Sequence, residues 1–139
     1  MNLRQMTMED ADKMLEWKNY AETRQFAIKT RAEIKREDHL KFLAENLDQF
    51  KIIRVEGEVV GAVRINDNEI SIWIDRQFWG YGFATEAIKT VSVKGMIAKI
   101  VDGNIASMRA FIKAGYFPKE IVRGEYTIVG QTNYYIFQC

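Results

Sequence analysis

The sequence contains very little of the two residues that most often build disulfide or metal-bound frameworks. It has one cysteine, Cys139, and one histidine, His39, in 139 residues. A single cysteine cannot form an internal disulfide, and no Cys/His cluster has the spacing of metal ligands. A chain of this length buries enough surface to fold without either support. We therefore expect one cytoplasmic, metal-free domain over residues 1–139.

The sequence also lacks a strong net charge and long apolar runs. The formal net charge is +1, and acids and bases are interspersed. This composition gives no electrostatic signature of nucleic-acid binding. The longest apolar runs have the length of a strand, which excludes a membrane-spanning helix. Residues 1–5 lack the apolar stretch of a signal peptide. We therefore expect no nucleic-acid partner and no membrane partner, and a monomer or a homodimer.

The apolar periodicity predicts an α/β domain built on one mixed sheet. The expected strands are 3–5, 50–55, 59–66, 69–74, 96–101, 121–128 and 133–138. The expected helices are 7–18, opened by a capping box at Thr7 and Asp10, then 36–46, 84–93 and a last helix after Asn104. Residues 19–30 are expected to be a loop or a frayed helical turn. Short polar turns join the second, third and fourth strands, so these three predict an antiparallel meander.

A glycine-containing loop follows the strand 69–74 and carries the most specific signal. It reads Gln77-x-x-Gly80-x-Gly82 and leads into the helix 84–93. In a strand–turn–helix unit, backbone N–H groups and the N-terminus of the helix converge on an anion. Glycine lets the backbone approach such a ligand where a Cβ would collide with it. The loop therefore predicts a phosphate or pyrophosphate site.

The loop departs from two other anion-binding motifs. A Walker loop requires Gly-Lys-Ser/Thr, but Phe83 follows Gly82. A dinucleotide-binding fingerprint requires a third glycine where Thr85 stands, although Asp102 lies where a ribose-binding acid could sit. The simplest alternative is a turn that uses glycine only for its dihedral freedom.

Together with a second motif, the loop resembles the GNAT N-acetyltransferase superfamily. The second motif is Asn104-x-x-Ser107, followed by a helix and Gly115-Tyr116. Asn104 suits a helix N-cap, and Gly115 is placed for a left-handed residue after the helix. The resemblance covers nearly the whole chain. It implies the GNAT fold, in which two parallel strands, here 69–74 and 96–101, splay apart at their C-terminal ends.

The resemblance also implies acetyl-CoA as cofactor. Backbone groups near Trp73 and Ile74 would hold the pantetheine arm, and amides of the glycine loop would hold the pyrophosphate. The implied cofactor-binding residues are Trp73, Ile74, Gln77, Gly80, Tyr81, Gly82, Phe83, Ala84, Thr85, Asn104, Ser107 and Phe111.

Acetyl transfer to an amine needs a neutral amine and a proton for the leaving thiolate. Many GNAT enzymes supply that proton from a tyrosine whose position here is Phe111, which has no hydroxyl. The donor is then water or another tyrosine, and Tyr116 is expected in the core instead. The open candidates are Tyr81, Tyr126, Tyr134 and Tyr135. Candidate catalytic bases are Glu69, at the start of its strand, and His39, whose imidazole titrates near neutral pH. Either could instead be an exposed structural residue.

The N-terminal third resembles one GNAT branch, the nucleotide-linked amino-sugar N-acetyltransferases of the pseudaminic-acid type. The motifs are Trp17-Lys18-Asn19, Arg24 and Glu37-Asp38-His39. Lys18 replaces an arginine of that branch, which keeps the charge but loses the fork geometry. The resemblance implies that Arg24 and His39 line the acceptor site, where Trp17 or Trp79 could stack on a sugar or base. Trp17 could equally be a core residue.

The sequence thus predicts an acetyl-CoA-dependent N-acetyltransferase that transfers acetyl directly to a primary amine. The favoured acceptor is an amino sugar carried on a nucleotide. An alternative is a protein N-terminal or ribosomal-protein acetyltransferase, whose Asn-x-x-Ser helix is very similar. A non-catalytic acyl-CoA-binding module is the alternative of another class.

Overall fold

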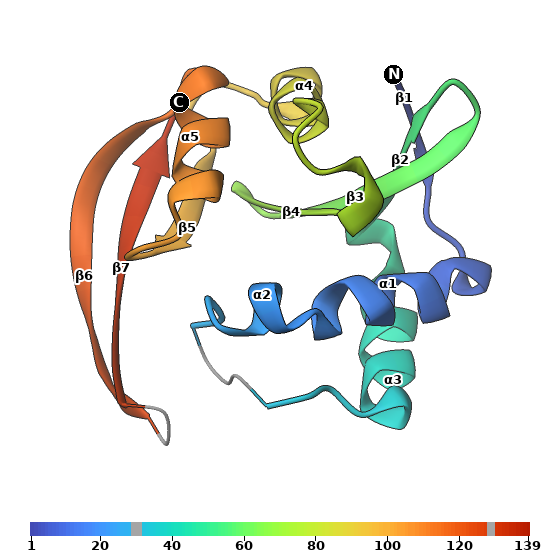
Figure 1. Ribbon diagram of the computed structural model, residues 1–139, viewed down its shortest axis with the longest axis horizontal. Coiled ribbons are helices and arrows are strands. Elements are labelled where there is room, and N and C mark those ends of the chain that lie inside the picture. Colours follow the sequence, from blue (N-terminus) through green and yellow to red (C-terminus); the bar gives the residue numbers. More distant parts are fainter. Residues whose placement is uncertain (29–31, 128–129) are drawn as a thin grey trace.

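The protein folds around one seven-stranded mixed sheet (Figure 1). A computed structural model describes residues 1–28, 32–127 and 130–139. The strands are β1 (Asn2–Gln5), β2 (Phe50–Val55), β3 (Glu58–Asn66), β4 (Glu69–Ile74), β5 (Ile97–Val101), β6 (Phe117–Thr127) and β7 (Gly130–Gln138). The α-helices are α1 (Ala11–Asn19), α2 (Ala21–Arg24), α3 (Arg36–Asn46), α4 (Phe83–Val91) and α5 (Ile105–Lys113). The order of the strands across the sheet is β1-β2-β3-β4-β5-β7-β6.

Helices cover both faces of the sheet and create two apolar clusters. In Figure 1, α4 and α5 lie on one face, and α1, α2 and α3 lie on the other. The first cluster joins Ile70 of β4 and Ile100 of β5 to Ile88 of α4 and Phe111 of α5. The second joins the sheet to α1 and α3 and includes Trp17, which is fully buried. The meander β2-β3-β4 is antiparallel as predicted.

The start of the chain confirms the predicted capping box. The amide of Thr7 donates to the Asp10 carboxylate (2.9 Å), within a short 3-10 helix, η1 (Met8–Asp10). The guanidinium of Arg4 on β1 holds the same carboxylate with two hydrogen bonds of 2.8 and 2.9 Å. The hydrogen bond from Arg4 is the main reason that the pKa of Asp10 is lowered. This pair fixes the entry into α1.

Helix α5 has the predicted caps at both ends. The side chain of Asn104 accepts a hydrogen bond from the amide of Ser107 (3.4 Å), which satisfies a donor of the first turn. Gly115 adopts a φ of +97°, the left-handed conformation that ends many helices. The amide of Tyr116 then donates back to the carbonyl of Phe111 (2.9 Å). The second motif of the sequence is therefore a well-formed helix with defined ends.

Several predicted boundaries differ from the structure by one to four residues, and two of them have a clear local cause. Helix α4 ends at Val91 instead of residue 93, because Ser92 turns to an extended ψ of 136° and its hydroxyl donates to the carbonyl of Ile88 (2.6 Å). Strand β6 begins at Phe117, earlier than predicted, although it contains Pro118. It is an edge strand, where a residue without an N–H is tolerated. The predicted end of this strand at residue 128 lies outside the described residues.

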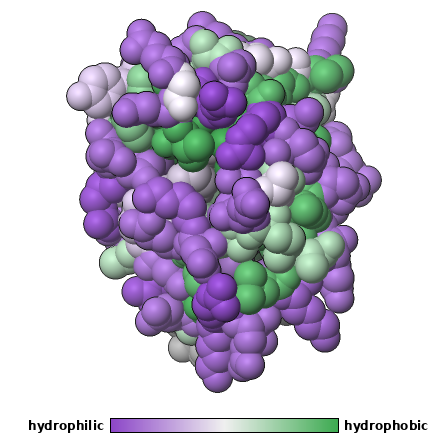
Figure 2. Space-filling view, turned by 90° about the vertical axis from the view of Figure 1, so that its right-hand side faces the viewer, coloured by the Kyte–Doolittle hydropathy of each residue, from purple (hydrophilic) through white to green (hydrophobic). Residues whose placement is uncertain are grey.

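The surface is mostly polar on the side opposite β6. Figure 2 shows this side as largely hydrophilic, with apolar residues in small separate patches. Most large apolar side chains are instead in the two clusters. Within the described residues, no helix has the length and apolar character needed to cross a membrane.

Candidate functional site

Strands β4 and β5 are joined only at their beginnings. The one register pair between these parallel strands in the described residues is Glu69 with Ile97. The amide of Ile97 donates to the carbonyl of Asn68 (2.8 Å), and the strands then diverge (Figure 1). An unpaired strand edge presents backbone donors and acceptors that can pair with an extended ligand. The predicted splayed pair is therefore present, open at the C-terminal ends.

The alternation of the backbone decides which groups face this opening. The amide of Asp75 donates to Val60 of β3 (2.8 Å), so the odd-numbered positions of β4 direct their backbone toward β3. The even-numbered positions Ile72 and Ile74 then face the open edge. The Trp79 indole N–H already occupies the carbonyl of Ile74 (2.8 Å). Trp73 was predicted to offer backbone groups to a ligand, but its backbone is on the β3 side.

The glycine loop presents a row of unpaired amides beside the opening. Gly80 and Gly82 adopt φ values of +86° and +78°, and a Cβ at either position would meet no atom within 4 Å. Gly82 is the N-cap of α4. In the described part of the chain, the amides of residues 80–85 have no hydrogen-bond acceptor. Free amides at a helix N-terminus, with the positive end of the helix dipole, suit a phosphate group.

The rest of the loop is held by a buried carboxylate, Asp75. It accepts hydrogen bonds from the indole of Trp17 (3.1 Å) and the amide of Gln77 (3.2 Å), and it forms an ion pair with Lys13 (3.3 Å). Burial raises the pKa of Asp75, but these three contacts outweigh burial and lower the pKa overall. Because the Gln77 amide donates to Asp75, that amide is already paired, and the predicted pyrophosphate contact there begins only at residue 80.

Trp17 is a core residue and cannot stack on a substrate as placed. Its side chain is fully buried, and its indole N–H is paired with Asp75. The helical spacing of α1 places Trp17 on the same face as Met14, which is also buried. The substrate role predicted for Trp17 is therefore not supported by its position.

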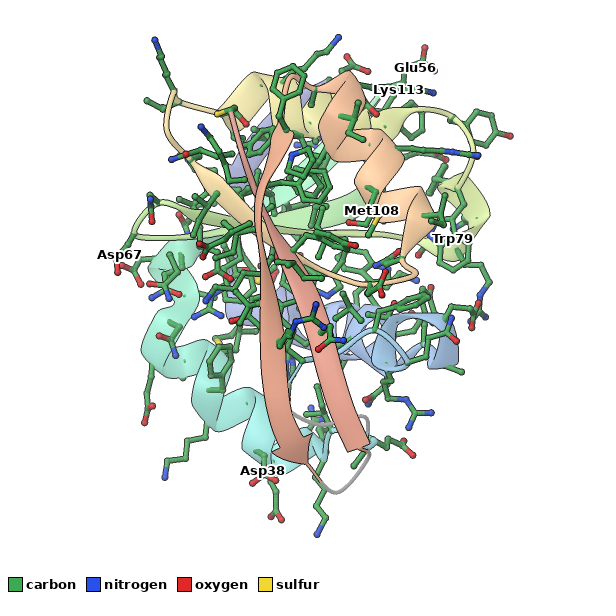
Figure 3. All side chains as sticks on the ribbon, turned by 90° about the vertical axis from the view of Figure 1, so that its left-hand side faces the viewer. Asp38, Glu56, Asp67, Trp79, Met108 and Lys113 are labelled. Atoms are coloured by element: carbon green, nitrogen blue, oxygen red, sulfur yellow. The ribbon has the colours of Figure 1, made fainter. Side chains whose placement is uncertain are left out.

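The segment after α1 is tied to the same loop. Arg76 forms an ion pair with Glu22 of α2 (3.0 Å), and its guanidinium lies 4.2 Å from the centre of the Tyr20 ring. Trp79 is 43% exposed and meets the Tyr20 ring edge-on at 6.0 Å. Seen from the β6–β7 side, Trp79 lies on the same side of the molecule as Met108 of α5 (Figure 3). Trp79 thus has an accessible ring, and its predicted stacking role stays a prediction.

Arg24 lies at the end of α2, near the open end of β5. Its Nε donates to the carbonyl of Asn19 (3.2 Å), and no ion pair holds it in the described residues. The ring of the nearby Phe26 comes within 3.9 Å of the Cβ position of Gly103, just after β5. The predicted role of Arg24 at the acceptor site stays a prediction, and its position is compatible with it.

The two predicted catalytic bases are not at the opening. Glu69 lies at the closed end of the β4–β5 pair, where its carboxylate forms an ion pair with Lys99 (3.2 Å). His39 is 2% exposed, and its Nε2 donates to the carbonyl of Ala11 (2.9 Å). Burial is the main reason that the pKa of His39 is lowered. His39 links α3 to α1. In this buried position it can neither contact an acceptor nor accept a proton from one.

Phe111 and Tyr116 belong to the core. Phe111 is 3% exposed and meets Tyr116 edge-on at 5.0 Å, so its predicted cofactor contact is not supported. The hydroxyl of Tyr116 shares a hydrogen bond with Ser92 (2.7 Å), and burial raises the Tyr116 pKa to about 12. Tyr116 is a core residue, as expected from its sequence position.

The other tyrosines differ in where they face. Tyr81 is 69% exposed and stacks on Phe83, with ring centres 5.7 Å apart. Tyr135 packs into the first cluster, beneath α5. Tyr134 is the register partner of Val101, at the open end of β5, and alternation turns its side chain to the α1 side of the sheet. The side chain of Tyr126 lies outside the described residues.

Two of the hollows on the surface of the described residues bear on the site. One, of about 240 Å³, lies beside the glycine loop and is lined by Val55, Glu56, Glu58, Val60, Gln77, Phe78, Tyr81 and Phe83. The other, of about 460 Å³, lies near the C-terminus and includes Lys94, Lys119 and Cys139 in its lining. The second shares no residue with the glycine loop or the strand opening. Among the described residues, no group of three or more His, Cys, Asp or Glu side chains could hold a metal ion.

Sequence reasoning missed one feature of the site. Lys18 and Arg64 lie over the same aromatic rings on the α1 side of the sheet. The sequence motif indicates Lys18 only as a replacement for an arginine, and Arg64 falls in the predicted strand 59–66 without any assigned role. Arg64 lies opposite Phe50 because of how strands β2 and β3 align, and no local sequence pattern predicts that alignment.

Comparisons with known proteins agree with this geometry. Residues 1–116 match the family model described as the acetyltransferase (GNAT) domain. A search of the curated proteins finds no match. A ribosomal-protein-alanine N-acetyltransferase structure from Brucella melitensis has 20% identity and a TM-score of 0.75, covering 100% of this chain and 99% of that one.

Two further solved structures share the fold. The yncA protein from Salmonella typhimurium, solved with its cofactor acetyl-CoA, has 16% identity and a TM-score of 0.78, covering 100% of this chain and 92% of that one. The aminoglycoside acetyltransferase AAC(6')-Ib, solved with coenzyme A, has 18% identity and a TM-score of 0.71, covering 99% and 94%. At these sequence identities, the similarity shows a shared fold and nothing more.

Proposed function

Because this chain belongs to the GNAT acetyltransferase family, we propose that it transfers an acetyl group from acetyl-CoA directly to a primary amine of a small molecule. The observation that carries the proposal is the row of unpaired amides at residues 80–85 beside the open edge of β4. The row of amides suits the pyrophosphate of coenzyme A, and the open strand edge suits its pantetheine arm.

The residues present fit the cofactor. The left-handed Gly80 and Gly82 leave open space where a side chain would otherwise stand. Their amides and those of residues 81 and 83–85 would hold the pyrophosphate, and the backbone of Ile72 and the amide of Ile74 would hold the pantetheine. Acetyl-CoA, when bound, supplies an activated thioester carbonyl. Binding both reactants in one site contributes much of the rate, because it replaces a bimolecular encounter.

The acceptor side is the sheet face covered by α1, opposite α4. Tyr134 turns its hydroxyl-bearing side chain to that face beside the end of β5, and we propose it as the proton donor to the leaving thiolate. The register of Tyr134 and the face to which its side chain points favour it as the donor over Tyr135 and Tyr116, which pack in the core. A positioned acid of this kind contributes roughly 10²–10⁴-fold to the rate. No buried base is needed in this proposal, since the amine can lose its proton to water before attack.

The favoured acceptor is a nucleotide-linked amino sugar. The motifs Trp17-Lys18-Asn19 and Arg24 support this class by their resemblance to that branch, although Trp17 and His39 are buried. Arg24 has the planar fork that suits a diphosphate, and Trp79 offers an accessible ring. A protein N-terminus is the second candidate, favoured by the full-length fold likeness to the Brucella ribosomal-protein-alanine enzyme.

A two-step experiment tests the function. Calorimetric titration with acetyl-CoA first measures cofactor binding, and we expect saturable binding at one site per chain. Acetylation is then measured on matched panels of amino-sugar nucleotides, free amino sugars and short peptides. Turnover on the sugar nucleotides supports the favoured acceptor, and turnover on peptides alone supports the second candidate. Cofactor binding without turnover on any amine would show a non-catalytic acyl-CoA-binding module instead.

A further inference from the structure

A group of two cations and three aromatic rings lies on the sheet face that α1 and α3 cover. Lys18 comes from the last turn of α1, and Arg64 comes from β3. The rings are Phe42 of α3, Phe50 of β2 and Trp73 of β4. We call these five residues the cation–aromatic cluster.

The two cations share the same rings. The ammonium of Lys18 lies 4.6 Å from the centre of Phe42, 5.5 Å from Phe50 and 5.8 Å from Trp73. The guanidinium carbon of Arg64 lies 5.1 Å from the centre of Phe42 and 5.5 Å from Phe50. Aromatic faces attract cations, but each such contact contributes only about 0.5–2 kcal/mol. The rings therefore orient the cations without neutralising them.

Neither cation has an acidic partner among the described residues. In the described part of the chain, no carboxylate forms an ion pair with Lys18 or Arg64. The Nε of Arg64 donates to the side-chain oxygen of Gln49 (2.8 Å), which fixes the plane of the guanidinium and leaves its terminal N–H groups available. The positive charge of Arg64 lowers the pKa of Lys18, and the positive charge of Lys18 contributes to the lowered pKa of His39.

Holding these two cations together without a bound anion is expected to reduce the stability of the fold. Burial and, as a smaller cause, the positive charge of Arg64 together lower the pKa of Lys18 to about 8. A protein that keeps two like charges together, partly removed from water and without a counter-charge, holds them in a state that an anion would stabilise.

The cluster lies next to the acceptor side of the opening. Trp73 belongs to β4, the strand whose other edge is open, and Arg64 is the register partner of Ser71 on the same strand. The cluster is on the face away from α4, so the pyrophosphate-binding amides of the glycine loop are on the other face of the sheet (Figure 1). An anion at the cluster is therefore a different group from the cofactor's phosphates.

We propose that the cation–aromatic cluster binds an oxyanion of the acceptor, a carboxylate or a phosphate group, between Lys18 and Arg64. The proposal rests on the proposed function and narrows its substrate class to amines that carry such a group. Arg64 can offer two parallel N–H groups to the two oxygens of the anion, and Lys18 adds a point charge. Phe42, Phe50 and Trp73 form walls that exclude water and favour the charge pairing.

Binding of inorganic phosphate and of acetate to the protein saturated with coenzyme A tests this site. Saturation matters because the coenzyme then occupies the amides of the glycine loop. We expect Lys18→Gln and Arg64→Gln each to weaken binding of the preferred anion by about tenfold or more. Lys51→Gln is the matched control, since Lys51 is exposed on the opposite face of β2, and it should leave binding unchanged.

A second measurement uses only the wild-type protein, so its outcome does not depend on whether a variant folds. NMR titration of the wild-type protein with labelled lysine follows the pKa of Lys18, which we expect to rise when the anion is added. No anion binding by the wild-type protein, or anion affinity unchanged in Arg64→Gln together with an unmoved Lys18 pKa, would overturn the proposal. The stronger of phosphate and acetate identifies the kind of oxyanion.

The outcomes separate this proposal from the proposed function. If both cations are needed for anion binding but no amine is acetylated, the cluster is an anion site and the acetyltransferase proposal fails. If amines are acetylated but a free amino sugar and its 1-phosphate show the same change of KM in Arg64→Gln, the acetyltransferase proposal stands and the cluster has no role in the acceptor.

Discussion

Single residues at the glycine loop determine whether a diphosphate can approach the backbone. Gly82 caps α4 with a left-handed φ of +78° and has open space where a Cβ would point. We expect Gly82→Glu to reduce acetyl-CoA affinity by at least ~100-fold, because it adds a side chain and a negative charge where the pyrophosphate binds. Calorimetric titration with acetyl-CoA measures this.

A second glycine provides the control for that loss. Gly95 also has a left-handed φ, +95°, and open space at its Cβ position, but it lies in the turn between α4 and β5. Gly95→Glu should carry a similar backbone strain and bind acetyl-CoA like the wild type. Equal losses of affinity in the two variants would mean that strain, and not contact with the cofactor, causes the effect.

We expect Lys18 to lower the free energy of unfolding, because its ammonium group is largely buried. Its folded pKa of about 8 is below the value near 10.5 of an unfolded chain, so the unfolded state binds more protons between these pH values. Wild-type stability should therefore rise as the pH increases from 8 to 10.5. Lys18→Met should abolish that rise and increase the free energy of unfolding at pH 7 by roughly 1–3 kcal/mol.

Urea denaturation at several pH values checks this prediction for Lys18. Lys51→Met, at an exposed position, should change stability by no more than about 0.5 kcal/mol. A Lys18→Met protein that is less stable than the wild type at pH 7 would show that the ring contacts of the ammonium outweigh its burial.

At the scale of elements, Asp75 connects α1 to the start of the glycine loop. It accepts hydrogen bonds from Trp17 and from the amide of Gln77 and pairs with Lys13. Asp75→Ala leaves a buried indole N–H without an acceptor, so it should cost about 2–4 kcal/mol of stability. Because its folded pKa is lowered, the Asp75 contribution is present above pH ~4 and is lost as the pH falls through the folded value.

Thermal and urea unfolding of Asp75→Ala between pH 2 and pH 7 test that role. The stability difference from the wild type should be largest near neutral pH and should shrink in acid. Asp38→Ala is the comparison, since Asp38 is exposed in the first turn of α3, and Figure 3 shows it at the lower end of the molecule. A pH-independent difference for Asp75→Ala would assign the cost to packing alone.

Strand β7 presents tyrosines to both faces of the sheet, and their roles should separate in kinetics. We expect Tyr134→Phe to lower kcat about tenfold or more with little change in acetyl-CoA affinity, since it removes the proposed proton donor. Tyr116→Phe should instead cost about 1 kcal/mol of stability, through the lost hydrogen bond with Ser92, and leave kcat unchanged. An unchanged kcat in Tyr134→Phe would leave water as the donor.

The local elements were more predictable from the sequence than the site was. Helix α3 and strands β2 and β4 have the predicted bounds, and the caps Asn104 and Gly115 are where their local physics places them. His39 and Trp17 were assigned to an acceptor site because their motif resembles one, but helix packing buries both. Glu69 is at the closed end of a strand pair, which only the register reveals. Burial and register depend on segments far apart in the chain.

At the scale of the whole molecule, the two faces of the sheet meet at one opening, and the proposed cofactor and acceptor sites lie on different faces. The α4 face carries the free amides of residues 80–85, and the α1 face carries Tyr134 and the cation–aromatic cluster. The β4–β5 split joins the two faces, because the strands pair only at Glu69 and Ile97. Cofactor and acceptor can therefore approach from opposite sides and meet between the strands.

A crystal structure of the protein with acetyl-CoA tests this account most directly. We predict pyrophosphate oxygens within hydrogen-bonding distance of the amides of residues 80–85, and the pantetheine arm along the open edge of β4. Coenzyme bound instead in the hollow of Lys94 and Lys119 near the C-terminus, with the glycine loop free of phosphate, would contradict it.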